Sequence, residues 1–327
     1  MKDHQAATPG WLKRWLSRLI GIALLAGVVI VATHFSEHKA FLRLASEAKP
    51  SWLMTAILLQ AATYLAQGEI WRTIGRAAKQ HLPLSYVYKL ALAKLFVDQA
   101  LPSAGVSGTV VIAQALENGP LPRGAIMAGV VINTTSFFSA YAAALAAAAV
   151  VVLLHHENPL IFLSCVLFIA FSVAVTLGLM KISGKNPPQH PRWLVKNHIV
   201  QNAFKIMADA DTKLVHSFYL QFVAASYQLL TFLLDAATLW VLIRSLGADV
   251  PPIDLYESYM VANLVRTVSF IPGGLGTFEG ALLLLLRHTR LAVHVGLASA
   301  LLFRGLTFFL PMIPGFWFSH RLAKKKL

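Results

Sequence analysis

The hydrophobic positions of this chain form long continuous runs, without the regular return of polar positions that marks a surface helix or strand. Charge-free runs cover 50–68, 124–154, 158–180 and 214–234. Each supplies the ~20 apolar residues that a helix needs to cross ~30 Å of hydrocarbon. The runs do not alternate with polar residues over ~10-residue segments, as the strands of an outer-membrane barrel would. The pattern predicts an all-α polytopic membrane protein.

Two further apolar segments, 85–116 and 255–286, are interrupted by proline and glycine. Such a break frees backbone groups that lipid cannot satisfy, so it must be buried in protein or line a water-filled cavity. Paired breaks in the two halves of a chain are typical of transporters, where they mark a site near the membrane midplane. The breaks read Leu101-Pro102-Ser103-Ala104-Gly105-Val106-Ser107-Gly108 and Ile271-Pro272-Gly273-Gly274-Leu275-Gly276-Thr277-Phe278-Glu279-Gly280. Around them we expect about six full spans, at 19–35, 51–70, 124–154, 159–180, 215–243 and 291–319.

The two interrupted segments correspond to each other. When Pro102 is placed on Pro272, Tyr86 falls on Tyr256. At ~1.5 Å per residue, the arms on either side of each break reach about 25 and 15 Å, which is too short for two full crossings. We therefore expect two re-entrant helical hairpins. An odd number of full spans separates them, so the hairpins would enter from opposite faces and the two halves would form an inverted repeat.

The composition leaves little room for a soluble domain. The chain is 57% hydrophobic and 13% charged, with a mean hydropathy of +0.64, whereas soluble domains carry about 25% charged residues. A net charge of +14 would favour nucleic-acid binding in a soluble domain. Here the cations collect between the apolar segments, so no nucleic-acid partner is expected. The lone Cys165 allows neither a disulfide nor a thiolate metal site, and we expect a buried, inert thiol.

The basic residues predict the orientation and the division of the chain. If both hairpins are re-entrant, most of the cations that flank the spans fall on one side, and the positive-inside rule then places both termini in the cytoplasm of a bacterial inner membrane. The first part, 1–50, would hold an uncleaved span and a periplasmic loop. The two repeats would cover 51–180 and 214–327, joined by a basic cytoplasmic linker at 181–213.

Charged residues inside the apolar segments are candidates for a functional site. An ionisable group at the centre of a span raises the free energy of membrane insertion by on the order of 3 kcal/mol. Such a group is therefore expected to have a charged or polar partner, or to serve a function. Asp98, Asp235, Arg266, Glu279 and Arg304 are such groups. They could form a structural network of ion pairs that fixes the helices, or some of them could face a substrate path. The sequence favours the second interpretation because charges and breaks occur together, but it does not assign the pairs.

The second break has the character of an anion site. Gly273, Gly274 and Gly276 allow positive φ and expose successive N–H groups, and a short helix from about Thr277 would present its positive end there. Glu279 lies in the first turn of that helix, where it could cap free N–H groups or bind a headgroup or a proton. The first break has only serine caps and no matching acid, so the hairpins are not expected to be equivalent.

A possible metal motif is weak. His155-His156-Glu157 lies in a short loop and lacks the helical H-E-x-x-H spacing of zinc enzymes. We expect no metal site in this loop, and the sequence indicates no cofactor.

The run from Arg266 to Glu279 resembles the P-G-G-x-G-x-x-E signature of the lysylphosphatidylglycerol synthase transmembrane family. The first break is similar to that family as well, and so is the segment around Arg304. The resemblance covers nearly the whole chain and implies a membrane domain that moves or accommodates lipids. The large members carry a soluble aminoacyl-transferase domain after the membrane part. This chain ends at Leu327, so we do not expect aminoacylation of lipid.

Together these features favour a flippase-like protein, not an enzyme, that moves a phospholipid or lipid-linked headgroup across the membrane. Its partners would be phospholipids with an anionic or aminoacylated headgroup. A homo-oligomer or a complex with a lipid-synthesis enzyme is compatible with this interpretation. Two alternatives stay open: a membrane-embedded lipid or glycolipid transferase, for which no general base or donor site is evident, and a non-catalytic partner of a lipid-synthesis enzyme. The candidate binding residues are Asp98, Pro102, Asp235, Arg266, Pro272, Gly273, Gly274, Gly276, Glu279 and Arg304.

Overall fold

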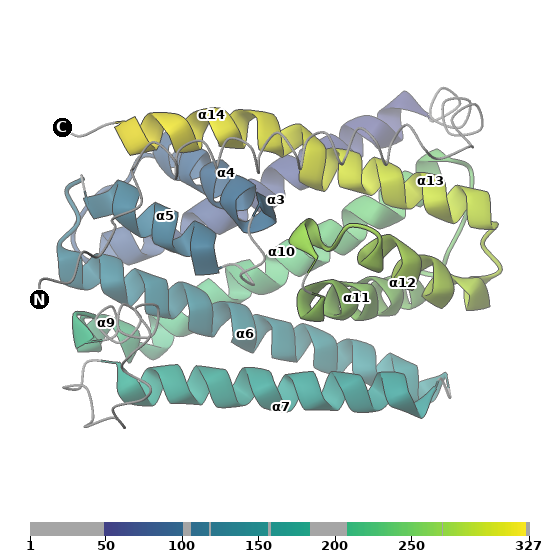
Figure 1. Ribbon diagram of the computed structural model, residues 1–327, viewed down its shortest axis with the longest axis horizontal. Helices are drawn as coiled ribbons and strands as arrows, with labels where there is room; N and C mark the ends of the chain where they lie inside the picture. The colour runs from purple at the N-terminus through teal and green to yellow at the C-terminus, as the bar shows by residue number, and fades with distance from the viewer. Residues whose placement is uncertain are drawn as a thin grey trace, which may run out of the picture. The chain divides into compact units, whose positions relative to one another are not determined.

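The computed structural model describes residues 49–100, 106–117, 119–155, 158–183, 208–269 and 271–324. These residues belong to one compact unit, Glu47–Leu327, and they form helices and no strand (Figure 1). The expected span at 19–35, most of the first break with Pro102, and most of the linker 181–213 lie outside the described residues. The all-helical class is confirmed for the part of the chain that the structure describes.

The longest helices coincide with the apolar runs. Four helical segments are long and apolar enough to cross a membrane: α6 (Arg123–Leu154), α7 (Pro159–Ile182), α10 (Phe218–Ser245) and the last segment, Val293–Arg321. Helix α3 (Pro50–Ala77) is equally long but less apolar. Its polar Gln60, Thr63 and Gln67 face other helices and not lipid, as the hydrogen bonds described below show.

The last segment changes its helical winding after Arg304. It consists of α13 (Val293–Arg304), a π-helical turn η4 (Gly305–Phe309) and α14 (Leu310–Lys324). A π turn disrupts the regular backbone hydrogen bonds, and two carbonyls here accept bonds from other helices. Tyr64 Oη donates to the Leu306 carbonyl at 3.2 Å, and Gln99 Nε2 donates to the Thr307 carbonyl at 3.0 Å. The turn therefore ties the last segment to α3 and α4.

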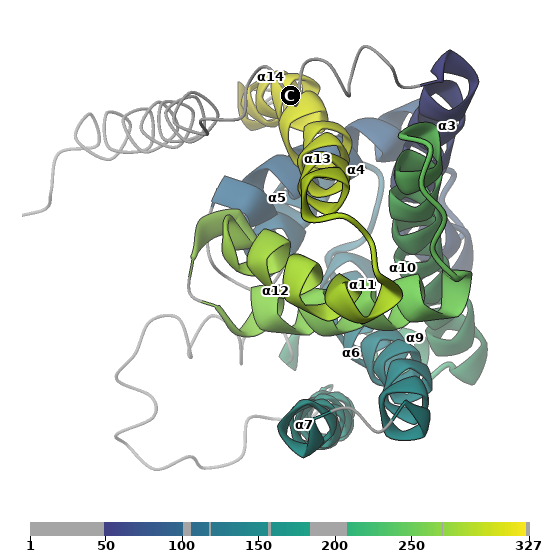
Figure 2. The same cartoon turned by 90° about the vertical axis from the view of Figure 1, so that its right-hand side faces the viewer.

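Both interrupted segments fold as two helices on either side of the break. The first comprises α4 (Leu84–Ala100) and α5 (Val106–Glu117), and the second comprises α11 (Pro252–Val268) and α12 (Thr277–Leu285). The two helices of each segment pack on each other. In Figure 2, α11 and α12 lie side by side, with α13 above them and α7 at the periphery. We call these pairs the first and the second hairpin.

Each hairpin has its own apolar core. One buried cluster joins the second hairpin to α13, to the C-terminal half of α6 and to α10. The other joins the first hairpin to α3 and to the N-terminal parts of α6 and α10. Helices α6 and α10 therefore contribute to both cores, each with a different part of its length. The short helix α9 (Thr212–Val215) contributes Val215 to the cluster around the first hairpin.

Helix α7 has the character of a lipid-facing helix. It packs on α6, while large apolar side chains such as Leu160, Leu167 and Phe171 are more than half exposed. Only Cys165 and Ser172 of this helix are buried, so the expected burial of the cysteine is confirmed. An exposed apolar surface of this extent is tolerated only when lipid or a partner covers it, which agrees with a helical membrane protein.

Candidate functional site

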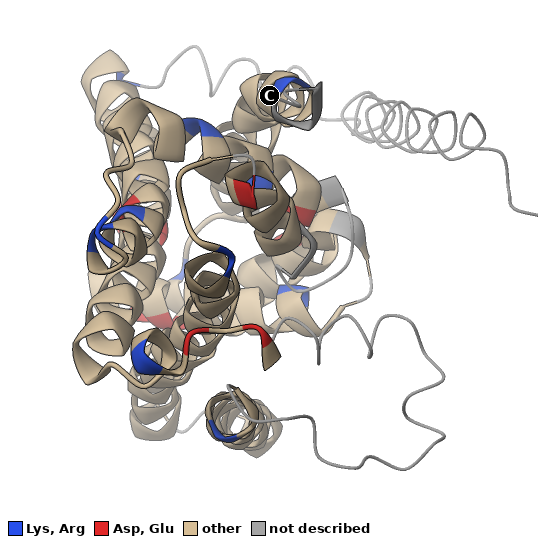
Figure 3. Cartoon of the chain, turned by 90° about the vertical axis from the view of Figure 1, so that its left-hand side faces the viewer, with Lys and Arg blue, Asp and Glu red and all other residues tan. Residues whose placement is uncertain are grey.

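A polar cavity lies among both hairpins and the helices between them. Its volume is about 160 Å³, enough for several water molecules or a small polar group, and its walls come from α3, α4, α6, α10, α11, α12, α13 and η4. Charged residues are sparse in the described helices, as the mostly tan ribbon of Figure 3 shows. Several of these few line this one cavity. The polar lining residues are Gln60, Thr63, Tyr64, Gln67, Lys94, Asp98, Gln99, Gln228, Thr231, Asp235, Tyr259, Asn263, Arg266, Arg304 and Thr307.

Glu279 and Arg304 form a buried ion pair beside the second break. The Arg304 side chain is 3% exposed, and its Nε donates to Glu279 Oε1 at 2.6 Å. Arg304 Nη2 also donates to the Gly274 carbonyl at 3.2 Å, and the guanidinium lies 4.7 Å from the centre of the Phe278 ring. These contacts connect α13 to the break and to α12. A buried pair of this kind fixes the position of both helices.

Glu279 also caps the helix that begins at the break. Its Oε2 accepts the backbone N–H of Gly276 at 2.7 Å, which satisfies one donor that the start of α12 leaves free. The glycines have positive φ as expected: 63° at Gly273, 63° at Gly274 and 84° at Gly276. The capping role and the ion-pair role therefore belong to the same carboxylate.

Arg266 contacts the break by its aliphatic stem and lines the cavity. A Cβ atom on Gly274 would lie 2.1 Å from Arg266 Cγ, so the absence of a side chain at this glycine lets the arginine pass. Among the described residues, the Arg266 guanidinium has no ion-pair partner within 4 Å, in contrast to Arg304. A cation that lines a cavity without a paired carboxylate is available for an anionic group.

Asp235 of α10 is held by neutral donors. Its Oδ1 accepts bonds from Gln60 Nε2 at 3.2 Å and Thr63 Oγ1 at 3.4 Å, and its Oδ2 accepts a bond from Tyr259 Oη at 3.3 Å. The network of ion pairs that the sequence allowed is thus divided. Glu279 and Arg304 form the direct pair, while Asp235 and Arg266 both line the cavity and neither makes an ion pair within the described residues.

Asp98 supplies the cap of the first hairpin. Its Oδ2 pairs with Lys94 Nζ at 2.7 Å, and its Oδ1 accepts the backbone N–H of Gly108 at 2.8 Å, in the first turn of α5. The expectation that the first break lacks a matching acid is wrong in this respect, because the acid comes from the preceding arm. The two hairpins therefore share a carboxylate cap, built from different positions. Ser107 has no described side chain, and Ser103 and Pro102 lie outside the described residues.

A chain of amides and hydroxyls extends from the cavity into the bundle. Gln67 Nε2 donates to Gln228 Oε1 at 2.9 Å, Gln228 Nε2 to Asn133 Oδ1 at 3.4 Å, and Asn133 Nδ2 to Thr109 Oγ1 at 3.1 Å. These neutral residues were not among the candidates predicted from the sequence, which were ionisable residues and the prolines and glycines of the breaks. The available signal was the presence of glutamine and asparagine in otherwise apolar runs, since such groups are buried only with partners.

One family model matches this chain, and it agrees with the cavity chemistry. A family described as Lysylphosphatidylglycerol synthase TM region matches residues 18–315. The match covers both hairpins and every candidate residue. No curated protein matches the chain. The family suggests a role that concerns membrane lipids, in agreement with a polar cavity among apolar helices.

Proposed function

Because this chain belongs to the lysylphosphatidylglycerol synthase transmembrane family, we propose that it translocates a phospholipid or lipid-linked headgroup across the bacterial inner membrane. One observation carries the proposal: Arg266 lines the cavity and forms no ion pair with another described residue. Phosphate is the group that phospholipid headgroups share, and arginine binds it in a bidentate manner.

The rest of the cavity lining suits the other parts of a headgroup. Asp235 accepts bonds only from neutral groups in the described chain, so its negative charge can attract an ammonium or aminoacyl cation. Lys94 and Asp98 neutralise each other and add a local dipole. Such a cavity binds a headgroup with a phosphate and a cation, and a purely anionic headgroup through Arg266 alone.

The size of the cavity defines which part of the lipid enters. A volume of about 160 Å³ admits a small polar group and cannot enclose two acyl chains. In our proposal only the headgroup passes between the hairpins, while the acyl chains stay in the lipid. Desolvating a charged headgroup in hydrocarbon is the main barrier to spontaneous exchange, and the lining replaces its water with fixed polar groups.

The proposal includes a topology for the two hairpins. In it both hairpins are re-entrant and inverted with respect to each other, and both termini are cytoplasmic. Glu279 with Arg304, and Asp98 with Lys94, hold the two breaks by their carboxylate caps. Opening one hairpin at a time would expose the cavity to one side of the membrane and then to the other.

The test is lipid exchange by the purified chain in liposomes. Fluorescent phosphatidylglycerol or a cationic aminoacyl lipid is placed in both leaflets, and a membrane-impermeant quencher reports the outer leaflet. The Arg266→Gln variant loses a charge-assisted hydrogen bond to the phosphate, which is worth about 1.5–3 kcal/mol. We expect this variant to exchange lipid about 10- to 100-fold more slowly than the unmodified chain. Arg244→Gln is the matched control, because Arg244 pairs with Asp249 and does not line the cavity.

Two results would contradict the proposal. Exchange no faster than in empty liposomes, for anionic, zwitterionic and cationic lipids alike, would refute translocation. A lipid that is chemically altered when cell extract supplies a donor would show that the protein is a transferase instead.

A further inference from the structure

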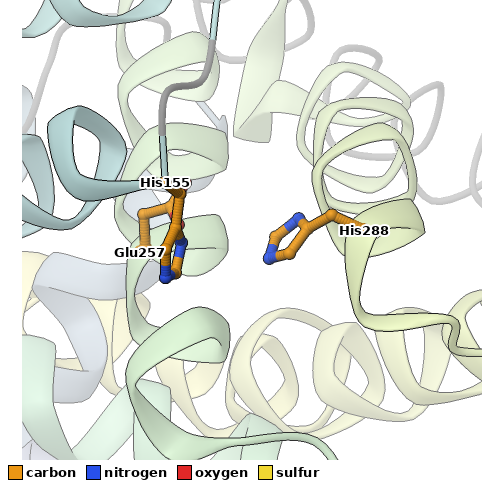
Figure 4. Close-up of side chains that lie close together, drawn as sticks. All are labelled: His155, Glu257 and His288. Carbon is orange, nitrogen blue, oxygen red and sulfur yellow. The ribbon is translucent and has the colours of Figure 1, made fainter.

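Three side chains from separate elements converge at the far end of the second hairpin. His155 directly follows α6, Glu257 lies in α11, and His288 lies in the short helix η3 (Leu286–Thr289) that follows α12. One potential ligand atom from each lies within 4.8 Å of the others. Figure 4 shows Glu257 beside His155, with the His288 ring facing both across a short gap. None of the three lines the polar cavity.

The carboxylate at the centre of this cluster is fully buried. Glu257 has 0% of its side chain exposed, and its Oε2 lies 3.5 Å from Nδ1 of His155. A buried carboxylate is strongly unfavourable unless a cation or several hydrogen bonds compensate it. Both imidazoles are exposed, so the cluster is also open to a ligand from outside the bundle.

Each imidazole has an acceptor near the nitrogen that would not bind the metal. A carboxylate oxygen of Asp254 lies 3.8 Å from His155 Nε2, where it can attract the Nε2 proton once Nδ1, which faces Glu257, binds a metal ion. His288 Nδ1 donates to the Leu285 carbonyl, because a carbonyl can only accept, and this places the lone pair on Nε2. Histidines that bind metals typically have their other nitrogen bonded to a carboxylate or a backbone carbonyl.

We propose that His155, Glu257 and His288 form a site for a divalent metal ion of the zinc class. Two imidazole nitrogens and one carboxylate are a known zinc ligand set that leaves a fourth position open. Nitrogen ligands argue against Mg²⁺ and Ca²⁺, which prefer oxygen. Ligand atoms around Zn²⁺ are about 3–3.5 Å apart, so the ion would draw these side chains together by roughly 1 Å.

The site would connect three parts of the chain that the sequence separates widely. The metal would tie the end of α6 to the start of α11 and to the end of α12, and so would hold both outer ends of the second hairpin. The expectation of no metal in the loop after α6 considered only residues adjacent to His155. The structure combines that histidine with two residues far along the chain.

Metal binding is measured on the full chain in detergent, purified without a histidine tag and stripped with a chelator. We expect about one equivalent of Zn²⁺ by calorimetry, and visible absorption bands when Co²⁺ replaces it. His288→Ala is the most informative variant because the side chain is exposed and its loss leaves the core intact. It should abolish the Co²⁺ bands, and Asp254→Asn, which changes only an outer partner, should weaken Zn²⁺ binding about 10- to 100-fold.

His294→Ala is the matched control, since His294 is also exposed and lies at the start of α13, outside the cluster. It should retain the Co²⁺ bands and the rise in melting temperature that Zn²⁺ causes in the unmodified chain. The proposal is overturned if the unmodified chain binds no Zn²⁺, in which case His155 and Glu257 form only an ion pair. It is equally overturned if His155→Ala and His288→Ala bind as well as the His294→Ala control.

Discussion

Replacing Gly274 by alanine probes the second break at its most constrained point. Gly274 has a φ of 63°, and an added Cβ would lie 2.1 Å from Arg266 Cγ. Positive φ costs an L-residue roughly 1–2 kcal/mol. The contact is far shorter than any that real Cβ atoms make, so the Arg266 stem must move, and overpacking of this kind costs about 1–3 kcal/mol. We therefore expect a loss of roughly 2–5 kcal/mol of folding free energy.

Two other glycines of the same segment separate these contributions. Gly276 has a φ of 84° but nothing within 4 Å of its Cβ position, so alanine there introduces only the backbone strain. Gly280 lies inside α12 with open space at the Cβ position, and alanine there should stabilise the helix by up to about 1 kcal/mol. The expected order of stability is Gly280→Ala, then Gly276→Ala, then Gly274→Ala.

Stability is followed by thermal unfolding of the purified variants in detergent, and translocation by the liposome assay. Gly274→Ala should also slow lipid exchange more than Gly276→Ala does, because it displaces the cation of the cavity. A Gly274→Ala variant as stable and as active as Gly280→Ala would refute two inferences. One is the close contact between Arg266 and Gly274, and the other is the role of Arg266 as a fixed phosphate ligand.

Other features of the site lead to further expected outcomes. Arg304→Ala should lower stability by about 3–5 kcal/mol, because it leaves the carboxylate of Glu279 buried without its cation; a stability change below 1 kcal/mol in thermal unfolding would contradict this. Asp98→Ala should destabilise by about 1 kcal/mol through loss of the α5 cap, while Asp98→Asn retains an acceptor and should lose less. Single cysteines introduced in 181–213, in a Cys165→Ser background, should label only from the cytoplasm, and labelling from outside would refute the inverted hairpins.

The elements of this fold were largely predictable because their signals are local. An apolar run has a length that can be compared with the bilayer, and proline and glycine interrupt helices wherever they occur in such a run. Apart from α3, which continues to Ala77, the long described helices begin and end within about five residues of the expected segments. The glycines of the second break have the positive φ that their lack of Cβ permits. Membership of the lipid-related family was likewise readable from the motif between Arg266 and Glu279.

The partners of the buried polar groups could not be predicted in the same way. The sequence identified Glu279, Arg304 and Asp235 as intramembrane charges, but only the packing of α13 against the break makes a pair of the first two and leaves the third to neutral donors. The cap of the first hairpin was missed because Asp98 acts from the other arm.

What the sequence alone determined is therefore the long helices of the described chain, the positions of the breaks and the identity of the ionisable groups that are costly to bury, because each depends on a short stretch of chain. The tertiary structure decided which groups meet. The cavity around Arg266 and the cluster of His155, Glu257 and His288 each join residues from several helices. Their proximity depends on how α6, α10 and the hairpins pack, and side-chain contacts across helices leave no periodic trace in the sequence.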